Sequence, residues 1–149
     1  MAERAPERSD DRAEVQDVVR RFYAAVESGD LDEMTALWQP GSQTLCVHPG
    51  FGPVRGTAKI LLSWALVMAQ ASYVQYVLTD ELVELQGDTA LAGVTENVLS
   101  AGRGTPVESF DGGRVVATFV LRRSGDGRWL ILARHASPLA DTWRTLEDM

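Results

Sequence analysis

Residues 44–61 have the sequence TLCVHPGFGPVRGTAKIL, and this stretch decides which fold the chain builds. The pattern through 42–48 predicts a strand, in which neighbouring side chains point to opposite faces. Thr44, Cys46 and His48 then share one face of that strand. A histidine therefore ends the strand, directly before a proline.

The segment that follows, 48–56, is rich in proline and glycine. Proline fixes φ and glycine adopts backbone conformations that other residues avoid, so this segment predicts a stiff turn. Thr57 is a suitable N-cap for a helix that continues to Ala71. From Tyr73 the apolar spacing changes to that of a strand. The uncharged run 60–79 therefore predicts a helix and a strand of a globular core rather than a membrane span.

The segments on either side complete the pattern. Apolar residues recur every three or four positions along 15–26 and predict a helix that stops at Gly29. Asp30 caps a second, short helix that ends at Pro40. Three helices, one early strand and a four-strand meander predict an α+β fold, with the helices packed on one face of a curved, mostly antiparallel sheet. The strands of the meander are expected at 74–85, 89–100, 114–123 and 128–137.

The composition limits the function classes. The chain has 149 residues, one cysteine and a formal net charge of -7. That length fits one domain, and the acidic balance disfavours nucleic acid as a partner, because phosphates select basic surfaces. A lone cysteine forms no internal disulfide, which favours a reducing, cytoplasmic location. The sequence has no phosphate-binding glycine motif, no nucleophile elbow and a single lysine, Lys59, so few residues remain for metal, Schiff-base or acid–base chemistry.

The two ends of the chain differ from the middle. Residues 1–12 are charged and lack the apolar core of a signal peptide, so we expect a disordered leader. Residues 13–138 form the single domain. In the tail, 139–149, the residues Leu139 and Trp143 would share one side of a helix, and this side could pack on a partner subunit.

Four stretches resemble the SnoaL-like, ketosteroid-isomerase-like branch of the nuclear transport factor 2-like superfamily. The resemblance covers roughly residues 13–138 and implies a cone-shaped fold that encloses one apolar pocket, usually in a homodimer. The same fold carries isomerases, dehydratases, cyclases and non-catalytic association domains. The four stretches are 21–30, Leu37-Trp38, 47–60 and 127–137.

The resemblance implies counterparts for only some of the catalytic residues of the isomerase branch. The family's catalytic base, an Asp before a Pro, corresponds to His48. Its oxyanion-binding Tyr corresponds to Phe22, with Tyr23 beside it. Its second Asp falls at Thr118 or Phe119, where no carboxylate stands. Any proton transfer therefore needs different groups.

Three residues are candidates for catalysis. His48 occupies the position of the family's base, and an imidazole titrates near neutral pH; the alternative is a turn histidine bound to its own loop. His135 shares a strand face with Trp129 and Ile131, and that face either lines the pocket or lies outside the sheet near a dimer interface. Tyr23 either donates a hydrogen bond to a ligand carbonyl or has its hydroxyl satisfied elsewhere.

Four further residues are candidates for the wall of the pocket, because pockets in this fold are cut from the core. A nucleophilic pair of Cys46 and His48, or zinc held by these two and His135, finds no support in the spacing, so we expect no metal and no cofactor. Glu96 is either buried or outward-facing, because alternation alone does not choose a face. The wall residues are Phe22, Trp38, Cys46 and Trp64.

Two hypotheses follow for the function. The first is a domain that binds a small apolar molecule in an internal pocket, either as a proton-transfer isomerase or cyclase or as a protein that only holds a hydrophobic metabolite. The second is a non-catalytic association or oligomerisation module, which the missing carboxylates and Trp143 favour. The resemblance also implies that the chain forms a homodimer. We expect neither nucleic acid nor a membrane as a partner.

Overall fold

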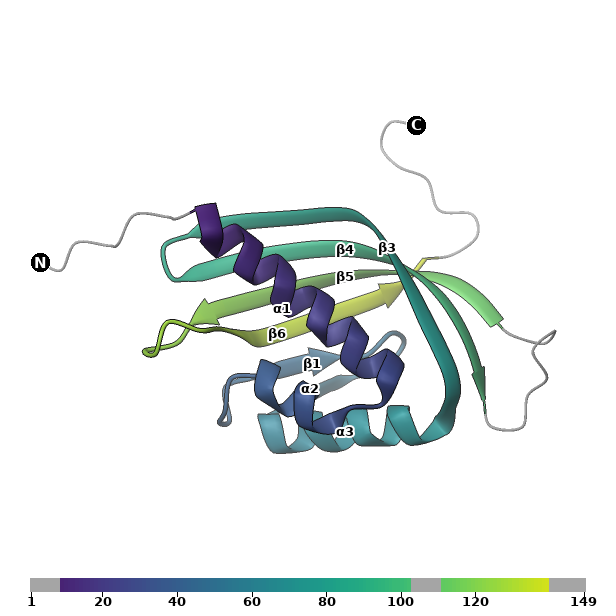
Figure 1. The fold of residues 1–149 in the computed structure, drawn as a ribbon. Coiled ribbons are helices and arrows are strands. Elements are labelled where there is room, and N and C mark those ends of the chain that lie inside the picture. The colour runs from purple at the N-terminus through teal and green to yellow at the C-terminus, as the bar shows by residue number, and fades with distance from the viewer. Residues whose placement is uncertain (1–8, 103–110, 140–149) are drawn as a thin grey trace, which may run out of the picture.

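Three helices and six strands make up the described residues, 9–102 and 111–139, of the computed structural model (Figure 1). The chain contains the predicted helices, early strand and meander, and one strand more than expected. The bounds are α1 Ser9–Ser28, α2 Leu31–Leu37, β1 Leu45–Val47, β2 Pro53–Arg55, α3 Thr57–Gln70, β3 Ala71–Gln86, β4 Thr89–Gly102, β5 Asp111–Arg123 and β6 Trp129–Pro138.

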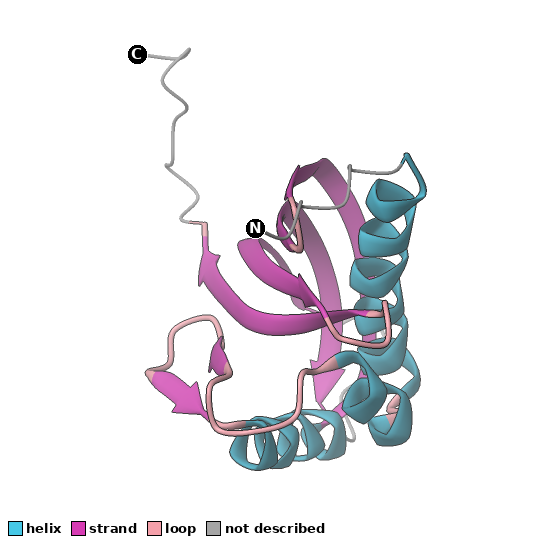
Figure 2. Ribbon diagram, turned by 90° about the vertical axis from the view of Figure 1, so that its left-hand side faces the viewer, coloured by secondary structure: helices cyan, strands magenta, loops and turns pink. Residues whose placement is uncertain are grey.

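The strands form one mixed sheet in the order β2-β1-β6-β5-β4-β3. Strands β3 to β6 are a meander of antiparallel neighbours, whereas β1 runs parallel to β6 and pairs Cys46 with Arg134. The helices lie against one face of the sheet, and no described helix covers the other face (Figure 2). The predicted α+β class and the mostly antiparallel sheet are confirmed, and the cone shape stays a prediction.

The apolar stripe of α1 packs on the inner face of the sheet, where its residues are buried. The first turn of α1 is held by the buried carboxylate of Asp11, which accepts hydrogen bonds from Arg123 at 3.1 Å and from Trp129 Nε1 at 3.2 Å. Such charge-assisted bonds are stronger than neutral ones. Residues 9–12 therefore belong to α1 and not to the leader expected at 1–12.

The segment between α2 and α3 differs from its prediction in two ways. Strand β1 is shorter than the expected 42–48, and part of the expected turn forms β2, which pairs antiparallel with β1. The proline-glycine connection at 49–52 is tight enough for the chain to turn back and pair with itself, so a segment predicted as turn also contains a strand.

Thr57 plays a different part from the predicted one. The N-cap of α3 is Gly56, at a φ of 85°, and no side chain caps the helix. The Thr57 hydroxyl instead donates to the Gln39 carbonyl oxygen at 2.6 Å and lies 2.8 Å from the Thr44 hydroxyl, from which it accepts. These bonds tie the start of α3 to the segments on both sides of β1.

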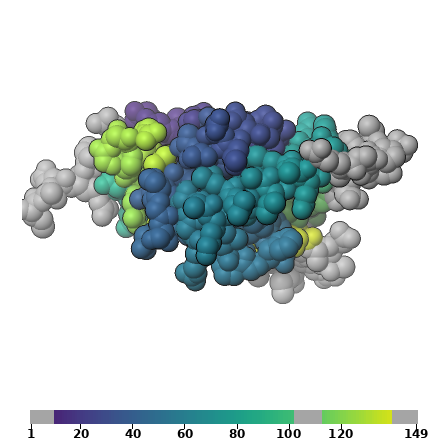
Figure 3. Space-filling model, turned by 90° about the horizontal axis from the view of Figure 1, so that it is seen from below, coloured from purple at the N-terminus to yellow at the C-terminus, as the bar shows by residue number. Residues whose placement is uncertain are grey.

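Helix α3 lies between the α1–α2 pair and the β1–β2 hairpin (Figure 3). It buries Ile60 and Trp64 and ends at Gln70, and β3 begins at once with Ala71. The predicted change from helix to strand within 60–79 is therefore confirmed. Within the described segments, no helix has both the length and the apolar character needed to cross a bilayer.

Only the first residue of the expected tail, 139–149, is described. The backbone N–H of Leu139 donates to the Arg114 carbonyl oxygen at 2.9 Å, which continues the pairing of β6 with β5 by one residue. The prediction for Trp143 lies outside the described residues.

Candidate functional site

Arg134 lies in the middle of the interior. It belongs to β6, is 2 % exposed, and is the largest side chain that the described fold buries completely. Its Nη2 donates to Glu96 Oε2 at 2.5 Å, and the Tyr23 hydroxyl donates to the same oxygen at 2.5 Å. A buried ion pair needs such additional bonds, because both ions have left water. Glu96 is therefore buried, which decides between its two predicted positions.

The groups around Arg134 keep it charged. Burial by itself would lower the pKa of the guanidinium, but the Glu96 carboxylate raises it above its ordinary value. Burial raises the pKa of the Tyr23 hydroxyl, and Glu96 adds to this effect while Arg134 opposes it. Arg134 is therefore a cation and Tyr23 a neutral phenol near pH 7. The guanidinium carbon also lies 5.0 Å from the ring centre of Phe22, 5.4 Å from that of Trp64 and 5.7 Å from that of Phe119.

A β-bulge turns Arg134 inward. The pairing of β6 with β5 shifts by one residue between Val120 and Leu121, which leaves Leu132 without a partner on β5. One extra residue moves every later side chain of the strand to the opposite face. Arg134 is therefore buried, and His135 is exposed.

His135 consequently lies outside the interior. The predicted strand face shared with Trp129 and Ile131 is wrong, because these two residues precede the bulge and are buried. Of the two positions considered for His135, the outer face of the sheet is the one observed. Its partner on β5, Thr118, is exposed as well, whereas Phe119 is completely buried beside Arg134.

His48 follows β1 and is half-buried. Its Nε2 lies 2.9 Å from Ser63 Oγ and 3.9 Å from Cys46 Sγ, and its ring packs edge-on against Trp64 with 4.6 Å between ring centres. Ser63 Oγ donates its own hydrogen to the Ile60 carbonyl oxygen, so it accepts from His48 Nε2–H. The neutral ring then has its lone pair on Nδ1. The side chain thus binds α3 rather than its own loop.

His48 and Cys46 are both neutral at pH 7. Burial, followed by the positive charge of Arg134, lowers the pKa of His48 below its ordinary value of 6.5. Burial raises the pKa of the Cys46 thiol, although Arg134 and Trp64 favour the thiolate. His48 can therefore accept a proton, while Cys46 is a thiol and not an activated nucleophile.

Four buried side-chain nitrogen atoms have no hydrogen-bond partner among the residues that the structure describes: Nε and Nη1 of Arg134, Nε1 of Trp64 and, outside this cluster, Nε1 of Trp38. Arg134 and Trp64 both favour the ionised form of the Cys46 thiol. Within 9–102 and 111–139, no group of three His, Cys, Asp or Glu side chains could hold a metal ion. We use the name buried polar cluster for Tyr23, Cys46, His48, Glu96 and Arg134.

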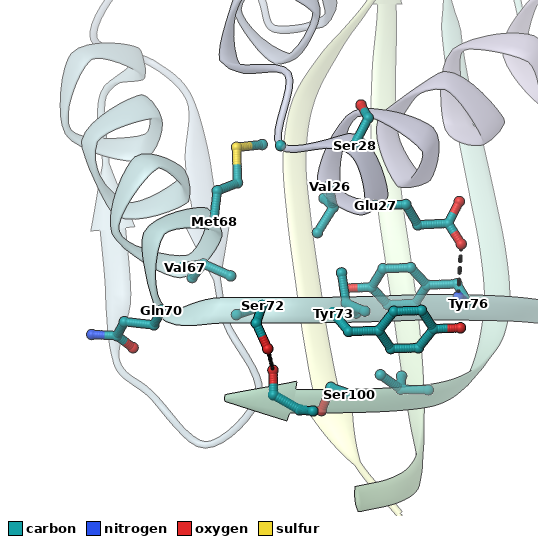
Figure 4. Close-up of a pocket in the computed structure, with 15 residues that line it drawn as sticks. Val26, Glu27, Ser28, Val67, Met68, Gln70, Ser72, Tyr73, Tyr76 and Ser100 are labelled. Atoms are coloured by element: carbon teal, nitrogen blue, oxygen red, sulfur yellow. Dashed lines mark hydrogen bonds between the residues drawn. The ribbon is translucent and has the colours of Figure 1, made fainter. Parts of the chain in front are cut away.

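A pocket of about 520 Å³ opens beside the buried polar cluster, between the C-terminal ends of α1 and α3 and strands β3 and β4 (Figure 4). Glu27 on its rim accepts a hydrogen bond from the backbone N–H of Tyr76 at 2.9 Å. The Tyr76 ring packs 4.9 Å from that of Tyr23, and burial together with Glu96 raises the pKa of Tyr76 to about 12. The apolar lining of the pocket consists mainly of Val26, Val67, Met68, Val74 and Val98.

The predicted site residues fall into two groups. Those that surround the buried polar cluster or belong to it are Phe22, Tyr23, Cys46, His48 and Trp64. Trp38 is buried near β6, where it bridges to Ile131, and His135 is on the outer face. The residues that line the pocket of Figure 4 include none of the predicted ones.

A family model described as a SnoaL-like domain matches residues 15–141, which is most of the chain and contains every residue of the buried polar cluster. The chain belongs to the SnoaL-like family. The solved structures that share its fold include proteins named as members of the nuclear transport factor 2-like superfamily and as ketosteroid isomerase-like. Comparison with curated protein sequences gave no significant match.

Two solved structures resemble this SnoaL-like protein in both sequence and fold. One, from Streptomyces avermitilis, is named a "putative dehydratase from the NTF2-like family"; it is 40% identical, and the match covers 88% of this chain and 97% of that one with a TM-score of 0.78. The other, from Thiobacillus denitrificans, is named a "putative calcium/calmodulin-dependent protein kinase type II association domain". It is 29% identical, and the match covers 84% of this chain and 94% of that one with a TM-score of 0.68.

Sequence reasoning missed two residues of this SnoaL-like site. Arg134 was missed because simple alternation along β6 does not show the bulge before it. The one available signal was Glu96, since a carboxylate among apolar neighbours needs a cation if it is buried. Ser63 was missed because a serine in a mostly apolar helix gives no sign that it faces a histidine 15 residues earlier.

Proposed function

We propose that this SnoaL-like protein binds a small, mostly apolar molecule in its interior and transfers a proton with His48 as the base. One observation carries this proposal: neutral His48 and cationic Arg134 pack against the same ring, that of Trp64, at 4.6 Å and 5.4 Å. A base beside a buried cation favours removal of a proton next to a carbonyl group, because the cation stabilises the charge that develops on oxygen.

In the proposed reaction, His48 Nδ1 takes a proton from carbon while Arg134 stabilises the resulting enolate oxygen. The Ser63 hydroxyl fixes the ring so that Nδ1 is the basic nitrogen. The proton then returns to another carbon, as in an isomerase, or leaves with a hydroxyl group as water, as in a dehydratase. The name of the Streptomyces relative supports the second outcome. Tyr23 acts only through Glu96, because its hydroxyl proton is already donated there.

The proposal is tested by exchange of the α-protons of small apolar ketones, esters and oxo acids in D₂O, followed by ¹H NMR. We expect the protein to accelerate exchange of at least one class and His48→Ala to lose roughly a hundredfold or more of that rate. His135→Ala, which changes the histidine outside the interior, is the matched control and keeps the rate. Exchange that is equally fast in His48→Ala removes the proposed base.

We also propose that a second copy of the chain covers the outer face of the sheet. Val77, Leu82 and Val116 are exposed there, and the row Leu82, Gly93, Thr118 and His135 crosses four strands. A single exposed apolar residue is normal, but several on one sheet face indicate an interaction surface. The association-domain name of the Thiobacillus relative supports an oligomer. A dimer through this face leaves the interior free, so both proposals can hold together.

A further inference from the structure

The unpartnered nitrogen atoms of the interior define a place for a negative charge. Arg134 uses Nη2 for Glu96 but leaves Nε and Nη1 without an acceptor among the described residues, and Trp64 leaves Nε1. Both residues are almost fully buried, and a buried donor without an acceptor destabilises a protein. Both residues lower the pKa of the Cys46 thiol, but a thiol is only a weak acceptor. These N–H groups therefore lack the oxygen atoms that would satisfy them.

The pocket of Figure 4 does not include these donors in its lining, but on three separate elements its lining residues follow closely on residues of the buried interior. On α3, Val67 and Met68 line the pocket one turn after Trp64. On α1, Val26 lines it one turn after Tyr23. A turn of helix rises about 5.4 Å.

On strand β4 too, a residue that lines the pocket closely follows a residue of the buried polar cluster. Val98 lines the pocket two residues after Glu96 on the same face, a step of roughly 7 Å. All three elements thus place the pocket one short step from the buried polar cluster, with Tyr76 between the two.

The charge of the interior selects the class of anion. Arg134 and Glu96 cancel each other, so the interior has no surplus positive charge, and a ligand with a single negative charge is the least costly anion to bury. Dianionic phosphate would bring twice that charge into the interior. A carboxylate carries one charge and has two oxygen atoms in a plane that suits a guanidinium group.

We infer that the ligand is an apolar carboxylic acid, with its apolar body in the pocket of Figure 4 and its carboxylate on Arg134 and Trp64 Nε1. This inference rests on the proposed function and names the class of its substrate. The pocket volume of about 520 Å³ is within the range of small-molecule sites, and its apolar lining suits a hydrocarbon chain or a phenyl group.

The test compares acids with their neutral amides on the full chain by isothermal titration calorimetry at pH 7. The probes are hexanoate and phenylacetate, hexanamide and phenylacetamide, and inorganic phosphate. We expect at least one acid to bind about tenfold or more tightly than its amide, which corresponds to roughly 1.4 kcal/mol or more. We expect phosphate not to bind.

Two variants locate the carboxylate. In Arg134→Met/Glu96→Gln, which removes both charges of the pair so that neither is left buried alone, acid and amide should bind within about twofold of each other. Trp64→Phe keeps an aromatic ring but removes Nε1–H, and should reduce the preference severalfold even if the double variant does not fold. Met68→Trp fills the pocket and should weaken acid and amide alike.

The inference is overturned if no acid binds, if acid and amide bind equally to the unaltered protein, or if phosphate binds as tightly as the acid. A preference that survives both Arg134→Met/Glu96→Gln and Trp64→Phe overturns it too. His48→Ala separates this result from the proposed function, because the acid preference should survive that change. If acids bind more tightly than amides but His48→Ala exchanges protons as fast as the unaltered protein, only the proposed base is wrong. If acids show no such preference but His48→Ala slows proton exchange, only the carboxylate site is wrong.

Discussion

Tyr23 joins the apolar stripe of α1 to the ion pair in the sheet. Its ring packs against Phe22 and Tyr76, and its hydroxyl donates to the oxygen of Glu96 that also accepts from Arg134. The phenol therefore donates one of the hydrogen bonds that the Glu96 carboxylate would receive from water if it were exposed. A hydrogen bond to a charged group contributes about 1.5–3 kcal/mol to stability.

We expect Tyr23→Phe to lower the free energy of unfolding by about 1.5–3 kcal/mol, measured by urea denaturation. Tyr73→Phe is the matched control, since the exposed Tyr73 hydroxyl donates to Gln75 at the surface and its loss should cost within about 0.5 kcal/mol. Equal effects of the two substitutions would show that the buried hydroxyl does not support the ion pair.

At the scale of single residues, periodicity was enough to place the apolar groups. The spacing along α1 predicted buried Phe22 and Tyr23, and the strand before Pro49 predicted that Cys46 and His48 share a face, which their contact confirms. The partners of these residues were not predictable. Whether Tyr23 meets a ligand or a carboxylate depends on which strand lies beneath it, and this is a property of the sheet register.

At the scale of elements, the helices and the meander follow from local patterns, and the β6 bulge does not. Repeating apolar positions and turn residues set the three helices and four long strands within a few residues of their predicted bounds. An extra residue at Leu132 has no local signature, because the run 129–133 is apolar throughout and marks no position at which the face changes. This single residue decides that Arg134, and not His135, faces the interior.

The bonds of Thr57 join elements rather than cap one. Its hydroxyl connects the Gln39 carbonyl oxygen after α2 with the Thr44 hydroxyl before β1, and α3 starts at the same point. These contacts hold β1, which His48 directly follows, against α3, which carries Ser63 and Trp64. The geometry of the base therefore depends on a threonine that touches neither the base nor the pocket.

We expect Thr57→Val, which keeps the shape but removes the hydroxyl, to lower the free energy of unfolding by about 1–3 kcal/mol in urea, because it leaves two polar groups without their partner. Thr35→Val on the exposed face of α2 should cost within about 0.5 kcal/mol. A Thr57→Val variant as stable as the Thr35→Val control would contradict this role.

At the scale of the whole molecule, the two faces of the sheet have opposite characters. The inner face combines apolar side chains with a charged pair under the helices, while the outer face has exposed apolar side chains and no described helix over it (Figure 2). The sequence could predict two faces but not which strand residues belong to each beyond the bulge. The proposed dimer depends on the outer face and the proposed chemistry on the inner one.

We expect the chain to be a dimer in solution and Val77→Lys/Val116→Lys to make it a monomer, measured by light scattering after size-exclusion chromatography. These side chains are 58% and 40% exposed, so lysine is tolerated in the monomer but places charge in the proposed interface. Leu62→Lys on α3, another exposed apolar residue, should leave the dimer intact. A monomeric unaltered chain, or a dimer that survives the double substitution, would rule out this face.

The titration of His48 by NMR tests the central claim most directly, because the claim requires its imidazole to share a buried space with the Arg134 cation. The account predicts a pKa below 6.5 in the unaltered protein, caused first by burial and then by Arg134, and a higher pKa in Arg134→Met/Glu96→Gln. A pKa at or above 6.5 that stays the same in the double variant would show that His48 faces solvent and that the two residues form no common site.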